Sequence, residues 1–440
     1  MTADAPPARR ILGNLFCEDE WAGGRRTPAR AALSTAAAAG TLLRAFAREG
    51  DRLWLPAPVD PGRMAEVPGL VVPEVETGPL AGWGGVGEVL VWGATAMRAN
   101  LVARRATVDL ARGGSPGRPA DPGDVPGAGL RPGLPPRAKS NAALRALPPP
   151  STADPLHDLL WRLPPPAPEV AAAVHHRAFC LGVAEDLGFA LPGARMVESL
   201  ADLEHLLAGP GAPRSWVVKA PLSAAGRDRY VERGETGLAD PAARRAVAGL
   251  LRRFGPLLFE PWMERTDDFG CAALLLPDGE LRIVSFHRQL VDRRGQFLGI
   301  ELAAEADGFA GLAAEERRRM EAAVSGVAAA LRAAGYRGPF GIDAWRYLGP
   351  GGSPVLHPLG EINARMTFGL VARTLVDRLR EPLGLTGSVR LRFGRAVPRD
   401  KDDKDFKDNR DGTSVVPLLL PGGEPPLAAW IEPAGGPGPP

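Results

Sequence analysis

Lysine is scarce in this chain of 440 residues, which takes its basic residues almost entirely from arginine. Only five lysines stand among the 53 basic residues, and three of them lie in one charged run between residues 401 and 407. Between Lys139 and Lys401 the only lysine is Lys219. A chain that avoids lysine and still places one in the apolar run 216–219 is using a compact point charge that a guanidinium does not replace. Lys219 is therefore the first candidate for a functional residue.

Paired cysteines, excess charge and long apolar runs are missing as well. The three cysteines are far apart and show no metal or disulfide spacing, which indicates a reducing compartment. A net charge of +2 gives no electrostatic reason for nucleic acid or an anionic membrane as partner. The N-terminus shows no signal-peptide pattern, and the apolar run 31–47 is too short to span a bilayer. We expect a cytoplasmic protein.

Strands and helices alternate in the first part of the chain, which predicts a small open α/β domain. Strands are expected at 10–17, 51–56 and 88–93, and helices at 29–48 and 95–105. Proline and glycine then dominate a linker at about 112–150, which buries too little apolar surface to order itself. The predicted divisions are 1–168 for this domain with its linker, 169–400 for a second domain with a hinge near 257–264, and 401–440 for a charged loop and C-terminal tail.

The second domain mixes helices with strands and hairpins. Helices are expected at about 170–187, 199–208, 313–335 and 368–380, and strands at 216–219, 257–260, 268–276, 281–290, 339–345 and 358–365. The sequence Pro277-Asp-Gly-Glu280 predicts a tight turn between two of these strands. This order of elements indicates an α+β domain.

Two groups of residues in this domain carry chemistry. Lys219 ends an apolar strand and is followed by a loop of small residues, the arrangement that a nucleotide-phosphate site requires. Glu361 and Asn363 are two apart on an expected strand, so both point to one face, and Asp343 lies on the strand before. Three oxygen ligands on paired strands suit Mg²⁺, which keeps several waters and bridges carboxylates to phosphates. The alternative is a polar strand face whose carboxylates pair with arginines.

The order of these motifs resembles the ATP-grasp superfamily. The matching features are the strand with Lys219, then Phe-Glu-Pro-Trp-Met at 259–263, an Asp-Phe-Gly strand at 268–270, Gly-Ile-Asp at 341–343 and Glu-Ile-Asn-Ala-Arg at 361–365. The likeness covers about residues 170–385. It implies an N-terminal open α/β pre-ATP-grasp domain followed by an ATP-grasp fold of two α+β subdomains.

The resemblance also implies roles for particular residues. Lys219 would contact the α-phosphate or the adenine end of ATP, and Arg365 would stabilise the charge that develops on an acyl-phosphate. The backbone of the small-residue loop, Ser223, Ala224, Ala225, Gly226 and Arg227, would close over the β- and γ-phosphates. The stretch Glu260, Pro261, Trp262 and Met263 would read adenine, and Asp267 or Asp268 would take the ribose hydroxyls. Asp343, Glu361 and Asn363 would hold Mg²⁺, with Mn²⁺ as the alternative ion.

Two departures from the family pattern stand out. The family loop is usually rich in glycine, whereas this one has only Gly226 among small residues. The family's earlier lysine is missing, and Arg177 stands in its neighbourhood as the substitute phosphate ligand. Among other residues, His287 is interpreted as structural rather than as part of the substrate site. Asn14, Glu18 and Asp19 follow the first strand, at the end where open α/β sheets place ligands, and are candidates for contact with the substrate, with solvent-exposed acids as the alternative.

The function implied is an ATP-dependent ligase that joins a small-molecule carboxylate to an amine or a thiol through an acyl-phosphate, with release of ADP. The alternatives are an ATP-grasp kinase, and a degenerate nucleotide-binding protein that serves as a regulator or scaffold. ATP and Mg²⁺ are the expected cofactors, and a homodimer is the commonest closed assembly for such a chain.

Overall fold

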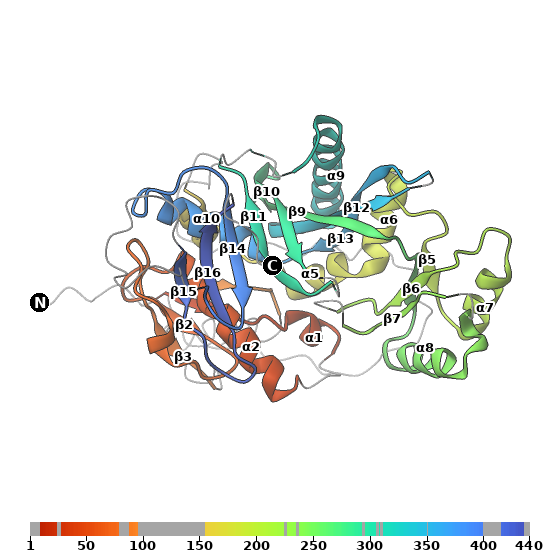
Figure 1. Cartoon of the computed structure of the whole chain (residues 1–440), viewed down its shortest axis with the longest axis horizontal. Coiled ribbons are helices and arrows are strands. Elements are labelled where there is room, and N and C mark those ends of the chain that lie inside the picture. The colour runs from red at the N-terminus through yellow and green to blue at the C-terminus, as the bar shows by residue number, and fades with distance from the viewer. Residues whose placement is uncertain are drawn as a thin grey trace, which may run out of the picture.

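The computed structural model describes residues 9–23, 28–78, 88–95, 155–223, 227–234, 237–292, 295–304, 308, 311–349, 351–398 and 415–434. Within these residues the strands form three sheets. Figure 1 shows the N-terminal sheet at the left, a long central sheet, and a smaller sheet at the right with its own helices. The predicted linker at 112–150, the helix predicted at 95–105 beyond Thr95, and the charged run 401–411 lie outside the described residues.

The N-terminal sheet is entirely parallel, with strand order β3-β2-β1-β4. Its strands are β1 Arg10–Leu12, β2 Arg52–Trp54, β3 Glu74–Glu76 and β4 Val89–Val91, and its helices are α1 Cys17–Trp21, α2 Arg30–Gly40, η1 Thr41–Phe46 and η2 Pro61–Arg63. Ala37 and Ala38 of α2 and the leucines of η1 are buried against this sheet. An open α/β unit forms here, as the sequence predicts.

The central sheet is antiparallel and has eight strands in the order β13-β12-β9-β10-β11-β14-β16-β15. Its strands are β9 Arg265–Leu275, β10 Leu281–Val291, β11 Phe297–Leu302, β12 Gly338–Leu348, β13 Pro354–Asn363, β14 Val389–Gly394, β15 Val416–Leu419 and β16 Ala428–Pro433. The turn between β9 and β10 is the predicted one: Gly279 takes a φ of +91°, and the Asp278 side chain accepts a hydrogen bond from the Glu280 amide.

Helices cover both faces of the central sheet. The long helix α9 (Ala314–Ala333) packs on one face through Met320, Val324 and Val327, and α10 (Phe368–Arg380) packs on the other through Leu370, Leu375 and Leu379. Gly335, with a φ of +80°, follows the end of α9 as predicted. The helices α4 Leu156–Arg162, α5 Pro168–His175 and α6 Arg177–Asp186 lead into this part of the chain.

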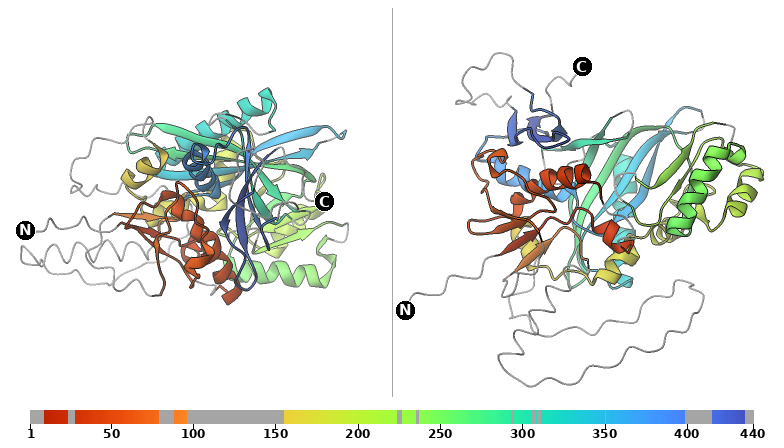
Figure 2. Two further views of the ribbon diagram at one scale, coloured as in Figure 1. Left: turned by 60° about the vertical axis from the view of Figure 1, so that its left-hand side comes forward. Right: turned by 90° about the horizontal axis from the view of Figure 1, so that it is seen from below.

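The small sheet has the strand order β5-β8-β6-β7 and carries Lys219. Its strands are β5 Arg195–Val197, β6 Trp216–Lys219, β7 Arg229–Glu232 and β8 Leu257–Pro261, and its helices are α7 Leu200–Ala208, η4 Gly237–Ala239 and α8 Pro241–Phe254. A separate core of Val197, Trp216, Val218 and Phe259 lies beneath the helices. In the right-hand view of Figure 2 this unit, drawn in green, stands beside the central sheet.

Two sequence predictions are corrected by the structure. The single helix expected at 170–187 is broken, because His176 adopts extended backbone (φ −64°, ψ 135°) and its side chain accepts a hydrogen bond from the Ala178 amide, which caps α6. The C-terminal tail expected over 401–440 is wrong for residues 416–433. These form β15 and β16, which bury Leu418, Leu419 and Ile431 in the core of the central sheet.

Candidate nucleotide and metal site

A row of residues across the central sheet brings the two predicted carboxylates together. Asp343 on β12 is in register with Glu361 on β13 and, on its other side, with Gly270 on β9, which is in turn opposite His287 on β10. Residues in one row of a sheet point to the same face, so these side chains share a surface. Beyond Asp343 the register between β12 and β13 shifts, because residues 343–345 of β12 lie opposite the longer stretch 357–361 of β13.

Both oxygens of Asp343 accept hydrogen bonds from amides. Gln289 donates through Nε2 at 2.7 Å, and Asn363 donates through Nδ2 at 3.1 Å. Burial and the negative charge of Glu361 raise the pKa of Asp343 to about 6. Asp343 and Glu361 are opposite each other, and these two hydrogen-bond donors to Asp343 are uncharged amides. A divalent cation would reduce the repulsion between the two carboxylates.

The donor set fits Mg²⁺, which keeps several waters when only one or two protein carboxylates hold it. Asp343 and Glu361 would be these carboxylates. The described residues contain no group of three or more His, Cys, Asp or Glu side chains arranged for a metal, so the set is two acids and an amide. Asn363 directs its Nδ2 to Asp343 and its Oδ1 to Arg365, and a half-turn of the carboxamide would present the oxygen to a cation.

Lys219 lies at the end of β6 and forms an ion pair with Glu260 on β8. Both side chains are nearly buried. Burial raises the pKa of Glu260, but the charge and hydrogen bond of Lys219, together with the charges of His357 and Arg177, outweigh this effect and the pKa is lowered. The Lys219 ammonium also lies 5.8 Å from the centre of the Trp345 ring, which adjoins the Asp343 row. Glu260, predicted to belong to the adenine-reading stretch, is in the structure the counter-ion of Lys219.

Arg177, the predicted substitute for the missing lysine, joins the small sheet to the metal row. It is the first residue of α6, where its guanidinium donates to the Ala220 carbonyl at 3.0 Å and to Ser223 Oγ at 3.4 Å. Its other nitrogen, Nη2, lies 3.2 Å from the carboxylate of Glu361. Arg177 thus connects the beginning of the predicted phosphate loop with the predicted metal ligands.

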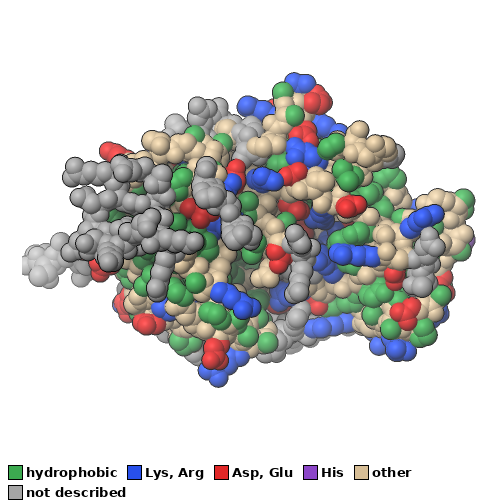
Figure 3. All heavy atoms as spheres, in the orientation of Figure 1, with side chains coloured by type: hydrophobic (Ala, Val, Ile, Leu, Met, Phe, Trp, Pro, Cys, Tyr) green, Lys and Arg blue, Asp and Glu red, His purple; other side chains and the backbone are tan. Residues whose placement is uncertain are grey.

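Basic side chains gather at the same junction, and we call Arg177, Lys219, Arg229, Arg233 and Arg265 the basic cluster. Burial lowers the pKa of Arg229, and the neighbouring charges of Arg265, Arg177 and Arg233 lower it further. Figure 3 shows blue side chains gathered between the central body and the lobe at the right. Like charges held together in this way favour a bound polyanion.

The predicted phosphate loop is described only at its two ends. Ser223 is buried, Arg227 lies 3.3 Å from Asp19 and over the ring of Phe16, and Ala224, Ala225 and Gly226 lie outside the described residues. The Ala220 amide donates to the Asp228 carbonyl at 2.9 Å, which closes the loop at its base. Asp228 has a φ of +51°, a left-handed conformation that aspartate tolerates better than most residues.

Of the residues predicted to bind adenine and ribose, some lie on the face of the candidate site and others do not. The Trp262 amide donates to the Ser215 carbonyl at 2.8 Å, and its ring lies between 5 and 6 Å from two guanidinium groups, those of Arg229 and Arg233. Met263 follows it directly after β8. Asp268 is in register with Trp345 and Gln289 and so shares the site face, where it pairs with Arg265. Asp267, on the opposite face, pairs instead with Arg288 and Arg346.

Several residues that the sequence did not assign to the site belong to this surface. His287 and Gln289 are two positions apart on β10, and this spacing predicts that their side chains share a face. His287 is buried against Gly270 and Gly369, and burial lowers its pKa to about 4. Trp345 had no distinctive signal, because its position depends on how β12 pairs with its neighbours.

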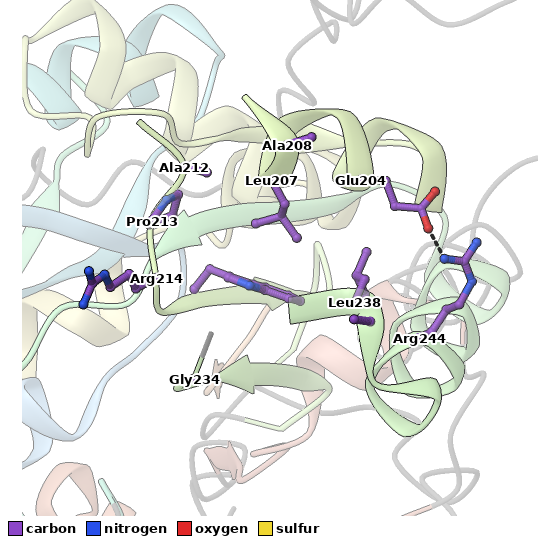
Figure 4. Close-up of a pocket in the computed structure, with 11 residues that line it drawn as sticks. Glu204, Leu207, Ala208, Ala212, Pro213, Arg214, Gly234, Leu238 and Arg244 are labelled. Atoms are coloured by element: carbon purple, nitrogen blue, oxygen red, sulfur yellow. Dashed lines mark hydrogen bonds and ion pairs between the residues drawn. The ribbon is translucent and has the colours of Figure 1, made fainter. Parts of the chain in front are cut away.

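A cavity of about 570 Å³ lies away from this site, between α7 and η4 in the small-sheet unit. Figure 4 shows Leu207 and Leu238 facing each other across it and the ion pair of Glu204 with Arg244 at one end. None of the predicted phosphate or metal ligands lines it. This cavity is therefore separate from the candidate site.

No family model and no curated protein matches the chain. Among solved structures it is similar to N5-carboxyaminoimidazole synthetase from Staphylococcus aureus complexed with ADP, at 8% identity over 99% of this chain and 95% of that chain, with a TM-score of 0.47. The corresponding ribonucleotide synthetase from Thermus thermophilus gives 15% identity, coverage of 97% and 94%, and a TM-score of 0.47.

A third similar structure is the biotin carboxylase domain of 2-oxoglutarate carboxylase from Hydrogenobacter thermophilus, in complex with MgADP, ADP and bicarbonate. Its identity is 16%, its TM-score is 0.41, and the match covers 61% of this chain and 64% of that domain, which is less than two thirds of its length. With TM-scores below 0.5, these likenesses carry no conclusion about family or function. The predicted fold class, an open α/β unit followed by α+β units, agrees with the one parallel and two antiparallel sheets of the described residues. In the described part of the chain, no helix is both long and apolar enough to cross a bilayer.

Proposed function

We propose that the chain is an ATP- and Mg²⁺-dependent ligase that joins a carboxylate to an amine or a thiol. The observation that carries this proposal is the contact of Arg177 with both Ser223 and Glu361. Through it, the basic cluster and the paired carboxylates Asp343 and Glu361 form one continuous surface. Cations beside two acids at a sheet junction suit a nucleotide polyphosphate and its metal ion.

The chain's own residues would bind and orient the reactants. Lys219 and Arg177 would turn from Glu260 and Glu361 to the phosphates, so that each gives up an internal partner for a nucleotide oxygen. Mg²⁺, when bound by Asp343 and Glu361, supplies charge neutralisation for the phosphates. In the reaction, a substrate carboxylate oxygen bonds to the γ-phosphorus as ADP leaves. The amine or thiol then attacks the acyl carbon, phosphate leaves, and the nucleophile loses its proton to phosphate or water.

The first experiment is a calorimetric titration of the folded chain with ADP in the presence and absence of Mg²⁺. We expect binding that strengthens with Mg²⁺ in the wild type and is weakened in Asp343→Asn. Screening of carboxylates with amines and thiols for ADP release follows. Absence of binding in a folded wild-type chain would overturn the proposal. A stable phosphorylated product that forms without a nucleophile would replace the ligase by a kinase.

A second candidate function is a nucleotide-binding regulator without turnover. The internal pairing of the site favours it, because Lys219, Arg177 and Asp343 each already have partners within the chain. A nucleotide must therefore displace existing contacts. Nucleotide binding with no ADP release under any combination of carboxylate and nucleophile would support the regulator over the ligase.

A further inference from the structure

A carboxylate from the N-terminal part of the chain reaches the site. Glu18, in the short helix α1, is 1% exposed and forms an ion pair with Nε of Arg365. Burial raises the pKa of Glu18, but the charge and hydrogen bond of Arg365, together with His175 and a backbone hydrogen bond, outweigh this effect and the pKa is lowered. A buried carboxylate is stable only when it is paired, so the contact fixes both partners.

The remaining nitrogens of Arg365 are also held. Nη2 donates to Asn363 Oδ1 at 3.0 Å, and Nη1 donates to the Met366 carbonyl at 3.1 Å. The guanidinium carbon lies 5.5 Å from the centre of the Trp92 ring, on the N-terminal side of the junction. Arg365 is thus clamped between the N-terminal unit and β13, and its orientation depends on Glu18.

Asp343 is the acid that competes with Glu18 for this arginine. Asn363 touches Arg365 with its oxygen and Asp343 with its nitrogen, so one carboxamide separates the guanidinium from the Asp343 carboxylate. If the charge of Glu18 were removed, Arg365 would remain buried, and Asp343, across that carboxamide, is another acid whose charge acts on it. A guanidinium on Asp343 would occupy the oxygens that a divalent cation needs.

We propose that Glu18 is a positioning residue for the metal site, because its carboxylate holds Arg365 away from Asp343 and keeps Asp343 available to a divalent cation. The inference rests on the proposed function, and it gives the N-terminal unit a part in the site. His175 supports the arrangement. Its Nε2 lies 4.0 Å from Glu18, and its Nδ1 accepts a hydrogen bond from the Ala364 amide at 3.2 Å, beside Asn363.

The test measures Mn²⁺ affinity of the full chain at saturating ADP by electron paramagnetic resonance. We expect Glu18→Gln to weaken Mn²⁺ binding about tenfold or more, which corresponds to about 1.4 kcal/mol. Glu18→Asp keeps the charge and should bind within about threefold of the wild type, a difference of roughly 0.6 kcal/mol. The double variant Glu18→Gln/Arg365→Met removes the competing guanidinium and should regain Mn²⁺ affinity.

Asp51→Asn is the matched control for lost stability. Asp51 is a buried acid of the N-terminal unit that pairs with Arg9, far from the metal row in its contacts. It should lower the melting temperature without changing Mn²⁺ affinity. The inference fails if Glu18→Gln binds Mn²⁺ like the wild type, or if the double variant stays as weak as the single one. A wild-type chain that binds no Mn²⁺ with ADP would instead overturn the proposed function, and the inference with it.

Discussion

Two variants, Lys219→Met and Lys219→Met/Glu260→Gln, separate the contribution of Lys219 to stability, through its ion pair with Glu260, from its contribution to nucleotide binding. The two side chains are 12% and 9% exposed, so the single change leaves Glu260 as a buried carboxylate without its cation. Breaking a buried pair by removing one partner costs about 3–5 kcal/mol of unfolding free energy. In Lys219→Met/Glu260→Gln the uncompensated charge is gone, and most of that loss should be recovered. Urea denaturation of the two variants measures the difference.

Nucleotide binding should respond differently, because the double variant still lacks the ammonium. One charge-assisted contact to a phosphate is worth about 1.5–3 kcal/mol, so ADP affinity should fall by roughly tenfold to a hundredfold in both variants. Calorimetric titration with MgADP at a temperature where both are folded provides the measurement. If the double variant recovers stability and also binds MgADP like the wild type, Lys219 is a structural cation and the reasoning is refuted.

Three further predictions concern pH, packing and the metal. The free energy of unfolding should fall by about 2.7 kcal/mol for each unit by which the pH is lowered near pH 5.5. Three buried histidines have folded pKa values of about 4, so the unfolded chain takes up their protons from pH 6.5 downward, while Asp343, raised to about 6, takes one up in the folded state. The histidines are His175, His287 and His357. Urea midpoints that stay unchanged from pH 7 to 5 would contradict this. Gly360→Ala places a Cβ 1.7 Å from the buried Trp345 ring and should cost about 1–3 kcal/mol, whereas Gly182→Ala in α6, which meets nothing within 4 Å, should be neutral or stabilising, as thermal melting of both will show. Asp343→Asn should abolish the Mg²⁺ dependence of ADP binding; an unchanged dependence in the calorimeter would place the cation elsewhere.

The candidate site could be predicted largely from local patterns. Lys219 was found because its residue type was rare and its strand apolar, and Glu361 and Asn363 because strand residues two apart share a face. The structure places Asp343 in register with Glu361, as the hairpin interpretation required. The roles of these residues as phosphate and metal ligands remain predictions. The strands β6, β8, β9, β10, β12 and β13, the turn at 277–280 and the ends of the long helices were also predicted, because their signals are local, whereas β3, β7, β11 and β14 were not predicted.

The rest depends on contacts between distant segments. Glu18 meets Arg365 across 347 positions, and no pattern around either residue indicates the other. The strands β15 and β16 were expected as a tail because a charged run and terminal prolines frame them, yet they add to the central sheet beside β14. The break at His176 was missed because apolar residues lie on both sides of it, and the signal for it is the His176 side chain that caps the beginning of α6.

The fully buried guanidinium of Arg44 has a consequence for the order in which the protein is built. It donates hydrogen bonds to the carbonyls of Ala65 and of Leu418, which is 374 positions later in the chain. An isolated bridge between Met64 and Leu419 joins the same two regions. The N-terminal sheet is synthesised before β15, so Arg44 lacks one of its two carbonyl acceptors until β15 has been made. The N-terminal unit therefore completes this packing contact only after a segment 374 positions later has folded against it.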